Sequence, residues 1–137
     1  HIGQGSYGQV HKATNRLTKQ VVAIKYIKGF MKNSDHAKMV VRELTILRKL
    51  SKIKKNIFTT KLLDVVLAGE PDKFESIFLV MEYVDQDLAK LTKTKNLLFD
   101  EEHALIILYN LLCCLNFVHS AGIMHRDLKP GNILVNN

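Results

Sequence analysis

The sequence has only two cysteines, and they lie side by side at positions 113 and 114. Neighbouring residues on a helix point about 100° apart and rarely form a disulfide. We therefore expect free thiols that fill space in a core, as is usual in a reducing compartment. A zinc site would need two separated pairs of ligands, and the sequence contains no such pairs.

Long hydrophobic runs and targeting signals are also missing. The most apolar stretch, residues 104–118, is interrupted by a tyrosine and two asparagines, so we interpret it as a buried helix and not as a membrane span. The chain begins at His1 without an initiator methionine, a basic leader or a small-residue cleavage site, so nothing indicates a signal peptide. Internal repeats and low-complexity segments are lacking as well.

What the sequence does contain is the composition of one ordinary globular domain. Of its 137 residues, 47% are hydrophobic and 24% are charged, which argues against disorder and allows a moderate core. The net charge of +7 permits an anionic partner but selects none. Lysines trail two of the expected helices, at positions 49, 52, 54 and 55 and at positions 90, 93 and 95. We interpret them as solvated helix faces.

Strand patterns dominate the first part of the chain. The expected strands lie within 1–28, around a glycine turn and a polar turn, and over 61–68 and 77–83, joined by a turn at 69–72. Between these two groups, apolar residues at spacings of three and four predict an amphipathic helix over 35–50, with Ser34 as its N-cap.

The second part of the chain is mostly helical. A short helix is expected over 87–91, and a longer one over 101–121 that is capped by Asp100 and stopped by Gly122. Residues 123–137 read as a loop between short strands. An antiparallel sheet with one helix, followed by a helical section, predicts an α+β fold with two lobes and a hinge after Tyr83.

A glycine-rich segment near the start has the spacing of a phosphate-binding loop. Residues 3–10, GQGSYGQV, fit the pattern G-x-G-x-x-G-x-V. Dinucleotide-binding folds use the same glycines, but there a helix follows at once so that its N-terminus meets the pyrophosphate. Here the residues after Gly8 continue as a strand, which favours a glycine hairpin lying over triphosphate oxygens.

A lysine closes the next apolar strand, where the sequence VAIK ends at Lys25. Burying an ammonium group without an anion is costly, so this side chain needs a partner. Nucleotide phosphates and Glu43, in the middle of the expected helix, are the two candidates. The alternative is a surface lysine on an edge strand, and the glycine segment at this spacing makes that the weaker interpretation.

The most specific motif is HRDLKPGN at residues 125–132. Asp127 can accept the proton of a substrate hydroxyl, Lys129 can neutralise charge on a transferred phosphoryl group, and Asn132 can supply an oxygen to a metal ion. Phosphoryl transfer depends on positioning and charge neutralisation more than on covalent chemistry, which explains an acid, a cation and an amide on one loop. A helix-terminating loop with a salt bridge is the structural alternative.

Together these three segments resemble the protein kinase family, and the resemblance covers the whole chain. It implies a two-lobe α+β fold, with an N-lobe of antiparallel sheet plus one helix over 1–84 and the start of the helical C-lobe over 85–137. It also implies ATP and Mg²⁺ as cofactors. Lys25 would bind the α- and β-phosphates while paired with Glu43.

The resemblance implies a full set of site residues. Asp127 and Lys129 would be catalytic together with the pair Lys25 and Glu43, and Asn132 would bind magnesium. The implied nucleotide-binding residues are Ile2, Gly3, Gly5, Ser6, Tyr7, Gly8, Val10, Ala23, Lys25, Met81, Glu82, Val84, Asp87, Lys129, Asn132 and Leu134. Among them, Met81 would be the gatekeeper beside the adenine.

The same resemblance narrows the subgroup. A lysine two residues after Asp127 is typical of serine/threonine kinases, and the segments 85–88 and 119–123 are similar to mitogen-activated protein kinases. Cyclin-dependent kinases are the nearest alternative. The resemblance implies protein substrates and an upstream activating kinase as partners, no nucleic-acid or membrane partner, and a cytoplasmic location that could extend to the nucleus.

No Asp-Phe-Gly segment follows the catalytic motif within these residues, and His1 stands close before the glycine segment. We therefore expect a partial domain that is inactive alone and only marginally stable. One alternative is a truncated, non-catalytic nucleotide-binding or scaffold module. A basic nucleic-acid binder, whose affinity would fall steeply with salt, has the least support.

Overall fold

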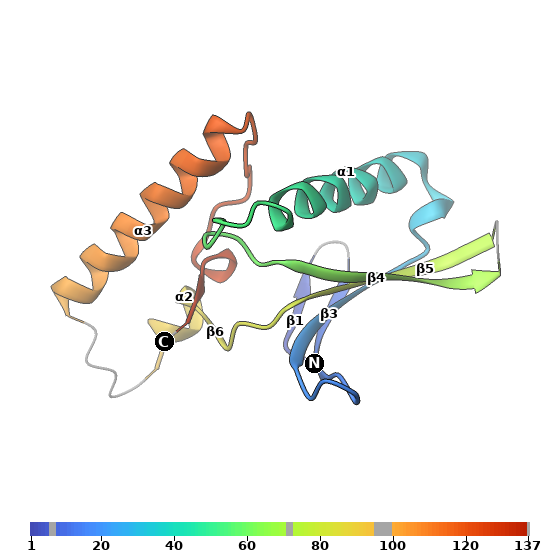
Figure 1. Cartoon of the computed structure of the whole chain (residues 1–137), viewed down its shortest axis with the longest axis horizontal. Coiled ribbons are helices and arrows are strands. Elements are labelled where there is room, and N and C mark those ends of the chain that lie inside the picture. Colours follow the sequence, from blue (N-terminus) through green and yellow to red (C-terminus); the bar gives the residue numbers. More distant parts are fainter. Residues whose placement is uncertain (6–7, 71–72, 95–99, 137) are drawn as a thin grey trace. The chain divides into compact units, whose positions relative to one another are not determined.

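The computed structural model describes residues 1–5, 8–70, 73–94 and 100–136. The chain forms two compact units, His1–Tyr83 and Val84–Asn137, and each is described by itself (Figure 1). The division falls one residue before the domain boundary suggested by the sequence.

The first unit is built on a five-stranded antiparallel sheet in the order β1-β2-β3-β5-β4. Its strands are β1 (Gly3–Gly5), β2 (Gly8–Thr14), β3 (Val21–Lys28), β4 (Leu62–Glu70) and β5 (Lys73–Glu82). A helical turn, η1 (Phe30–Lys32), and the helix α1 (Ser34–Ser51) connect β3 to β4. The expected strands and the one expected helix are therefore all present in this unit.

One face of the sheet carries the core, and α1 packs on it (Figure 1). Ile27 and Leu79 are fully buried there against Val40 of the helix. Alternate residues of a strand point to opposite faces, so β3 sends Ala23, Lys25 and Ile27 toward this side. Burying side chains of this size stabilises a fold by about 1.5–3 kcal/mol each, which is what holds α1 to the sheet.

The N-cap of α1 differs from the prediction. Asn33, in extended backbone, accepts hydrogen bonds on its side chain from the amides of Asp35 and His36, whereas Ser34 is already the first helical residue. Asparagine and serine are both good N-cap residues, so the sequence pattern did not distinguish between these two neighbours and the prediction was off by one residue. The helix ends at Ser51, close to the expected residue 50.

The β4–β5 hairpin is longer than the sequence suggested. Gly69 and Glu70 were expected in the turn but belong to β4, where they pair with Phe74 and Lys73 of β5. Phe74 packs against the core cluster, which draws the polar start of β5 into the sheet. Residues 71–72 of the expected turn lie outside the described part of the chain.

The second unit holds two helices and a small antiparallel pair of strands. Its elements are β6 (Gln86–Asp87), α2 (Leu88–Leu91), α3 (Glu101–Ser120), η2 (Pro130–Asn132) and β7 (Leu134–Val135). The cap of α3 is the predicted one, because Asp100 accepts a hydrogen bond from the amide of His103. Gly122 follows the helix end with a φ of 71°, a backbone conformation that glycine adopts without strain.

The expected burial of α3 is wrong for this chain. Only Val118 is buried, and much of the apolar surface is exposed, including Leu105, Ile106, Leu108, Tyr109 and Leu112. A helix that is apolar on all sides is typical of a core position, but the described residues offer too few neighbours to cover it. Cys113 and Cys114 are both half-buried thiols, and burial raises the pKa of the Cys114 thiol.

The length of α3 also corrects the sequence analysis on membranes. The helix has 20 residues and a mean hydropathy of 1.5, so by length and composition alone it could cross a bilayer. The interruptions, Tyr109, Asn110 and Asn116, are too few to bring the average below that of a membrane span. A core helix of a soluble domain passes the same test.

Candidate active site

The glycine segment forms two paired strands. Gly3 of β1 lies opposite Val10 of β2, and Gly5 lies opposite Gly8. A Cβ at position 8 would come within 2.2 Å of the Tyr26 carbonyl oxygen in β3, so only glycine allows β2 to lie this close. Sheet packing therefore explains this glycine.

Gly3 has no such explanation. A Cβ at Gly3 would meet nothing within 4 Å, so the chain itself does not require glycine there. Ser6 and Tyr7, both predicted to bind nucleotide, lie outside the described residues. Gly5 is described by its backbone, as the last residue of β1.

The predicted pair of Lys25 and Glu43 is present. The Lys25 ammonium donates to a Glu43 carboxylate oxygen over 2.6 Å, from the middle of β3 to the middle of α1. The side chains are 16% and 35% exposed, so the pair is partly shielded from water. Removing one partner would leave the other charge in an environment that disfavours it.

Three apolar residues of the predicted nucleotide-binding set share a sheet face with Lys25. Directly opposed residues of neighbouring strands project to the same face. Val10 lies opposite Lys25, and Met81 lies opposite Ala23, which is itself two residues from Lys25. The sheet therefore places an ammonium beside a patch of apolar side chains.

The resemblance implies that backbone groups of Glu82 and Val84 would bond the edge of an adenine. The Glu82 amide donates to the Lys61 carbonyl over 2.9 Å, so only the carbonyl of Glu82 could serve the edge of an adenine. Ile2 is held in place by the hydrogen bond from its amide to the Val10 carbonyl. Val84 is half-buried and begins the second unit.

In the second unit the predicted catalytic residues lie together. One carboxylate oxygen of Asp127, Oδ2, is 2.9 Å from the Lys129 ammonium and 3.0 Å from the Asn132 amide nitrogen. The Asn132 side chain also donates to the Asp127 backbone carbonyl over 2.7 Å, which closes the loop on itself. An acid, a cation and an amide are thus held on one exposed loop.

These neighbours change the acidity of Asp127. The hydrogen bond from Lys129, followed by the one from Asn132, holds the pKa of the Asp127 carboxyl below its usual range. The group is therefore fully ionised near neutral pH. An ionised carboxylate can orient a hydroxyl by accepting its hydrogen bond.

Two further residues of the motif, His125 and Arg126, shape this loop through contacts and backbone geometry that the motif did not predict. The Asp127 amide donates to the His125 ring nitrogen Nδ1 over 3.2 Å. Arg126 adopts a φ of 67°, which is uncommon for a residue other than glycine and is often found at functional sites. Strained backbone of this kind has no signature in the sequence beyond the motif itself.

Asn132 meets one condition for holding a metal ion. Its amide nitrogen makes both hydrogen bonds to Asp127, and its Oδ1 accepts none from the described residues. Amide oxygens are suitable ligands for Mg²⁺. Within the described ranges no group of three His, Cys, Asp or Glu side chains could hold a metal, so Asn132 would be part of an incomplete set.

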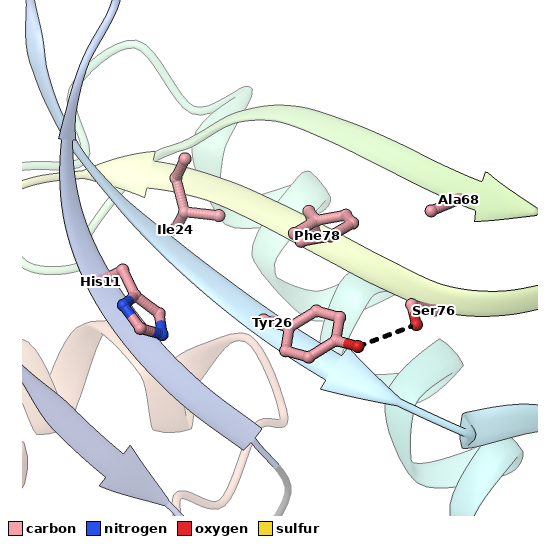
Figure 2. Close-up of a pocket in the computed structure, with 6 residues that line it drawn as sticks. All are labelled: His11, Ile24, Tyr26, Ala68, Ser76 and Phe78. Carbon is pink, nitrogen blue, oxygen red and sulfur yellow. Dashed lines mark hydrogen bonds between the residues drawn. The ribbon is translucent and has the colours of Figure 1, made fainter. Parts of the chain in front are cut away.

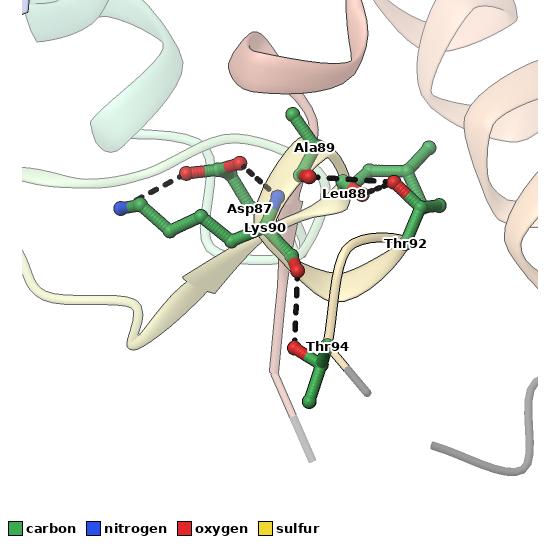
Figure 3. A network of polar contacts seen from close by, with 6 residues as sticks. All are labelled: Asp87, Leu88, Ala89, Lys90, Thr92 and Thr94. Carbon is green, nitrogen blue, oxygen red and sulfur yellow. Dashed lines mark hydrogen bonds and ion pairs between the residues drawn. The ribbon is translucent and has the colours of Figure 1, made fainter. Parts of the chain in front are cut away.

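Both carboxylate oxygens of Asp87, a residue predicted to bind nucleotide, already have partners within the second unit. It caps α2, accepting from the Lys90 amide on one carboxylate oxygen and pairing with the Lys90 ammonium at 3.0 Å on the other (Figure 3). Burial alone would raise the pKa of Asp87, but these hydrogen bonds lower it overall. Leu134, predicted beside the adenine, lies directly opposite Asp87 in the β6–β7 pair.

Two open depressions of the first unit lie away from Lys25. One open depression of about 440 Å³ is lined by His11, Ile24, Tyr26, Ala68, Ser76 and Phe78 (Figure 2). Its floor includes the stacked rings of Tyr26 and Phe78. Ile24 and Tyr26 alternate with Lys25 along β3, so this depression is on the opposite face of the sheet and does not belong to the site.

Comparison with known proteins adds an independent finding. The family model for the protein kinase domain matches residues 1–137. The chain is 40% identical to mitogen-activated protein kinase p38b of Drosophila melanogaster, over 98% of the chain and 36% of that protein. It is 41% and 42% identical to mitogen-activated protein kinases 2 and 7 of Arabidopsis thaliana, over 98% of the chain and 35% of each. The chain thus spans about a third of the length of these relatives.

Proposed function

The chain belongs to the protein kinase family, and from that premise we propose that the protein is an ATP-dependent serine/threonine kinase of the mitogen-activated type. It would transfer the γ-phosphoryl group of ATP to hydroxyl groups of protein substrates. The relatives named above are mitogen-activated protein kinases, which supports the subgroup. Family members in general use ATP and Mg²⁺.

The observation that carries the proposal is the arrangement around Asp127. A lowered pKa keeps this carboxylate ionised, so that it can accept the hydrogen bond of a substrate hydroxyl and aim the oxygen at phosphorus. Lys129, which already points at the same carboxylate, can turn its charge to the incoming phosphoryl oxygens. Both groups are exposed, as residues that must meet a protein substrate have to be.

The first unit would hold the nucleotide. Lys25, oriented by Glu43, would contact the phosphates, while Val10, Ala23 and Met81 would pack on the adenine. The open space at Gly3 leaves room for phosphate oxygens close to the backbone. Mg²⁺, which would neutralise charge on the phosphates, would be held in part by Asn132 through Oδ1.

Partners and location complete the proposal. The subgroup supports protein substrates and an upstream activating kinase. Cysteine thiols are compatible with the reducing cytoplasm or nucleus. We interpret α3 as a core helix of the complete domain, so the proposal includes neither a membrane nor a nucleic-acid partner.

The experiment compares phosphoryl transfer by the full-length protein and two variants, with labelled ATP and a mixture of serine- and threonine-containing peptides. Asp127→Asn removes the carboxylate and should lower kcat by at least about a hundredfold. Asp35→Asn, a matched change at an exposed aspartate of α1, should leave kcat unchanged. Equal activity of Asp127→Asn and the unchanged protein would contradict the proposal.

A further inference from the structure

The strand β4 forms one edge of the five-stranded sheet. Within the described residues it pairs with β5 and with no other strand. It is nine residues long and contains neither proline nor lysine. Its charged residues, Asp64 and Glu70, and its two register shifts lie toward the ends, so the middle of the strand from Val65 to Leu67 is regular and uncharged. An edge of this kind presents a row of backbone donors and acceptors to any extended chain that approaches it.

The register shows which backbone groups face outward. In an antiparallel strand, successive residues direct their amide and carbonyl to opposite neighbours. The Glu75 carbonyl accepts from Gly29, at the end of β3, so even-numbered residues of β5 such as Phe78 face β4. Phe78 lies opposite Val66, and the outward-facing residue of β4 is therefore Leu67.

Val65 shows the same orientation independently. Its amide donates to the neighbouring Asp64 carboxylate over 2.8 Å instead of to β5. The outward groups that remain at the middle of the strand are the Val65 carbonyl and the amide and carbonyl of Leu67. Two acceptors and one donor are enough to begin a new antiparallel ladder.

Apolar side chains flank this edge on both faces of the sheet. Leu67 lies opposite Ile77, on the face of the core, while Val66 lies opposite Phe78, on the other face. The side chains of Leu67 and Val66 are 44% and 47% exposed, and that of Leu63, near the start of the strand, is 42% exposed. A strand added here would cover apolar surface on either side of its backbone, which stabilises association.

A cluster of cations lies at the N-terminal end of β4. Between Glu43 and Asp64 the chain has no acidic residue. The basic cluster consists of six exposed residues, Arg48, Lys49, Lys52, Lys54, Lys55 and Lys61. Arg48 and Lys49 lie in the last turn of α1, where positive charge interacts favourably with the helix dipole. The other four residues follow the helix, so the dipole does not explain them.

The loop that carries the cluster is held rigidly. Asn56 is 1% exposed, and its side chain donates to the Leu50 carbonyl over 3.1 Å and to the Thr59 hydroxyl over 2.7 Å. Its own carboxamide oxygen accepts from the Phe58 amide. The Ser51 hydroxyl, which accepts from the Leu62 amide over 2.7 Å, fastens the loop to the start of β4. The cations are therefore presented from a preorganised frame, which lowers the entropy lost on binding.

We propose that the edge of β4 and the basic cluster form one docking site for an extended, acidic segment of a partner protein. The segment would add a strand antiparallel to β4, with apolar residues along Val66 and Leu67. Acidic residues would follow at its C-terminal end, because antiparallel pairing brings that end to the N-terminus of β4. Charge complementarity selects this occupant, since the described residues near the cluster contain no anion that pairs with its cations.

Other occupants fit the surface less well. Nucleic acid could contact the cations through its phosphates, but it has no extended peptide backbone to pair with the edge of β4. A second copy of this chain would bring the same strand edge but a basic cluster instead of an acidic one. A strand that carries negative charge is the occupant that pairs with the backbone groups of β4 and also neutralises the basic cluster.

The test uses the full-length protein and a fluorescein-labelled peptide in which a valine–threonine strand segment is followed by a run of glutamates. Fluorescence anisotropy should show saturable binding that weakens with salt. A peptide with lysines in place of the glutamates should not bind. Hydrogen exchange should show new protection of the Leu67 amide, with the amides of β3 unchanged.

Two pairs of variants separate the two parts of the site. Leu67→Pro removes the outward amide and should weaken binding about five- to tenfold, while Leu67→Val should not. Lys54→Glu with Lys55→Glu should weaken binding about tenfold or more. Lys32→Glu with Lys93→Glu makes the same change in net charge elsewhere and should change affinity little.

Several results would overturn the proposal. They are equal binding of the glutamate and lysine peptides, equal effects of the two double variants, and unchanged exchange at Leu67 when peptide is bound. The exchange measurement is made on the unaltered chain, so it decides the question even if Leu67→Pro fails to fold. Protection of β4 that rises with chain concentration and needs no peptide would assign the edge to a second copy instead.

Discussion

At the scale of single residues, Asp127 shows how neighbours set the chemistry. Lys129 and Asn132 hold its pKa below the ordinary value of 3.8, so the folded loop favours the ionised form. The carboxylate therefore contributes stability above the pKa of the unfolded chain. That contribution is lost as the pH falls through the lower folded pKa, below 3.8.

Lys129→Met removes the first of these neighbours, so we expect the pKa of Asp127 to rise toward 3.8. A pH titration of the Asp127 carboxyl carbon by NMR measures it. Lys93→Met, which removes an exposed lysine far along the chain from this loop, serves as the control. If Asp127 titrates identically in the Lys129→Met variant and the unchanged chain, the ion pair is not the cause of the lowered pKa.

Gly8 gives a second prediction at this scale, because its missing Cβ lets β2 approach the Tyr26 carbonyl. We expect Gly8→Ala to lower the free energy of unfolding by about 1–3 kcal/mol, since backbone must shift to relieve the overlap. Gly3→Ala, in open space, should change it by less than about 0.5 kcal/mol. Urea denaturation measures both, and similar losses would contradict the packing explanation.

At the scale of elements, the residue that caps α1 in the structure differs from the one that the sequence pattern predicts. Asn33 accepts the two amide hydrogen bonds that Ser34 was expected to accept. We expect Asn33→Ala to destabilise the first unit by about 1 kcal/mol. Ser34→Ala should have little effect, because alanine is a good helical residue. Thermal unfolding compares the two, and the reverse order would restore the original assignment.

The elements also show how far local patterns reach. The ends of α3 were predictable, since Asp100 and Gly122 act on backbone groups within one turn. The start of β5 was not predictable, because the mostly polar residues 73–76 join the sheet through pairing with β4, contacts with the end of β3 and packing of Phe74. Propensity carries no information about such distant partners.

The candidate site also has features that local sequence patterns predicted and features that they did not. The pair of Lys25 and Glu43 followed from the cost of burying an ammonium, and the structure contains it. The loop around Asp127 followed from a dense motif. The buried Asn56 and the positive φ of Arg126 did not, because both depend on a three-dimensional frame that short spacings do not reveal.

At the scale of the whole molecule, α3 exposes a large apolar surface that the described residues do not cover. Apolar area in water of this size promotes association. We expect the 137-residue chain to bind a hydrophobic dye strongly and to be only marginally stable. Leu108→Lys with Leu112→Lys should reduce dye binding without lowering the unfolding midpoint, since both side chains are more than half exposed.

The matched control for α3 is Leu79→Lys, which places a charge in the core of the first unit and should unfold that unit. A large loss of stability in the Leu108→Lys and Leu112→Lys double variant would show that the chain itself covers α3. The account of the exposed helix would then be wrong.

The proposed function requires that one metal–nucleotide complex reaches residues of the first unit and of the second. The most direct measurement adds a non-hydrolysable ATP analogue with paramagnetic Mn²⁺ in place of Mg²⁺ to the isotope-labelled full-length protein. NMR signals of Gly3 and Lys25 in the first unit and of Asp127 and Asn132 in the second should all broaden, and none should broaden with Mn²⁺ alone at the same concentration. Broadening confined to one unit, or equal without the nucleotide, would contradict the account.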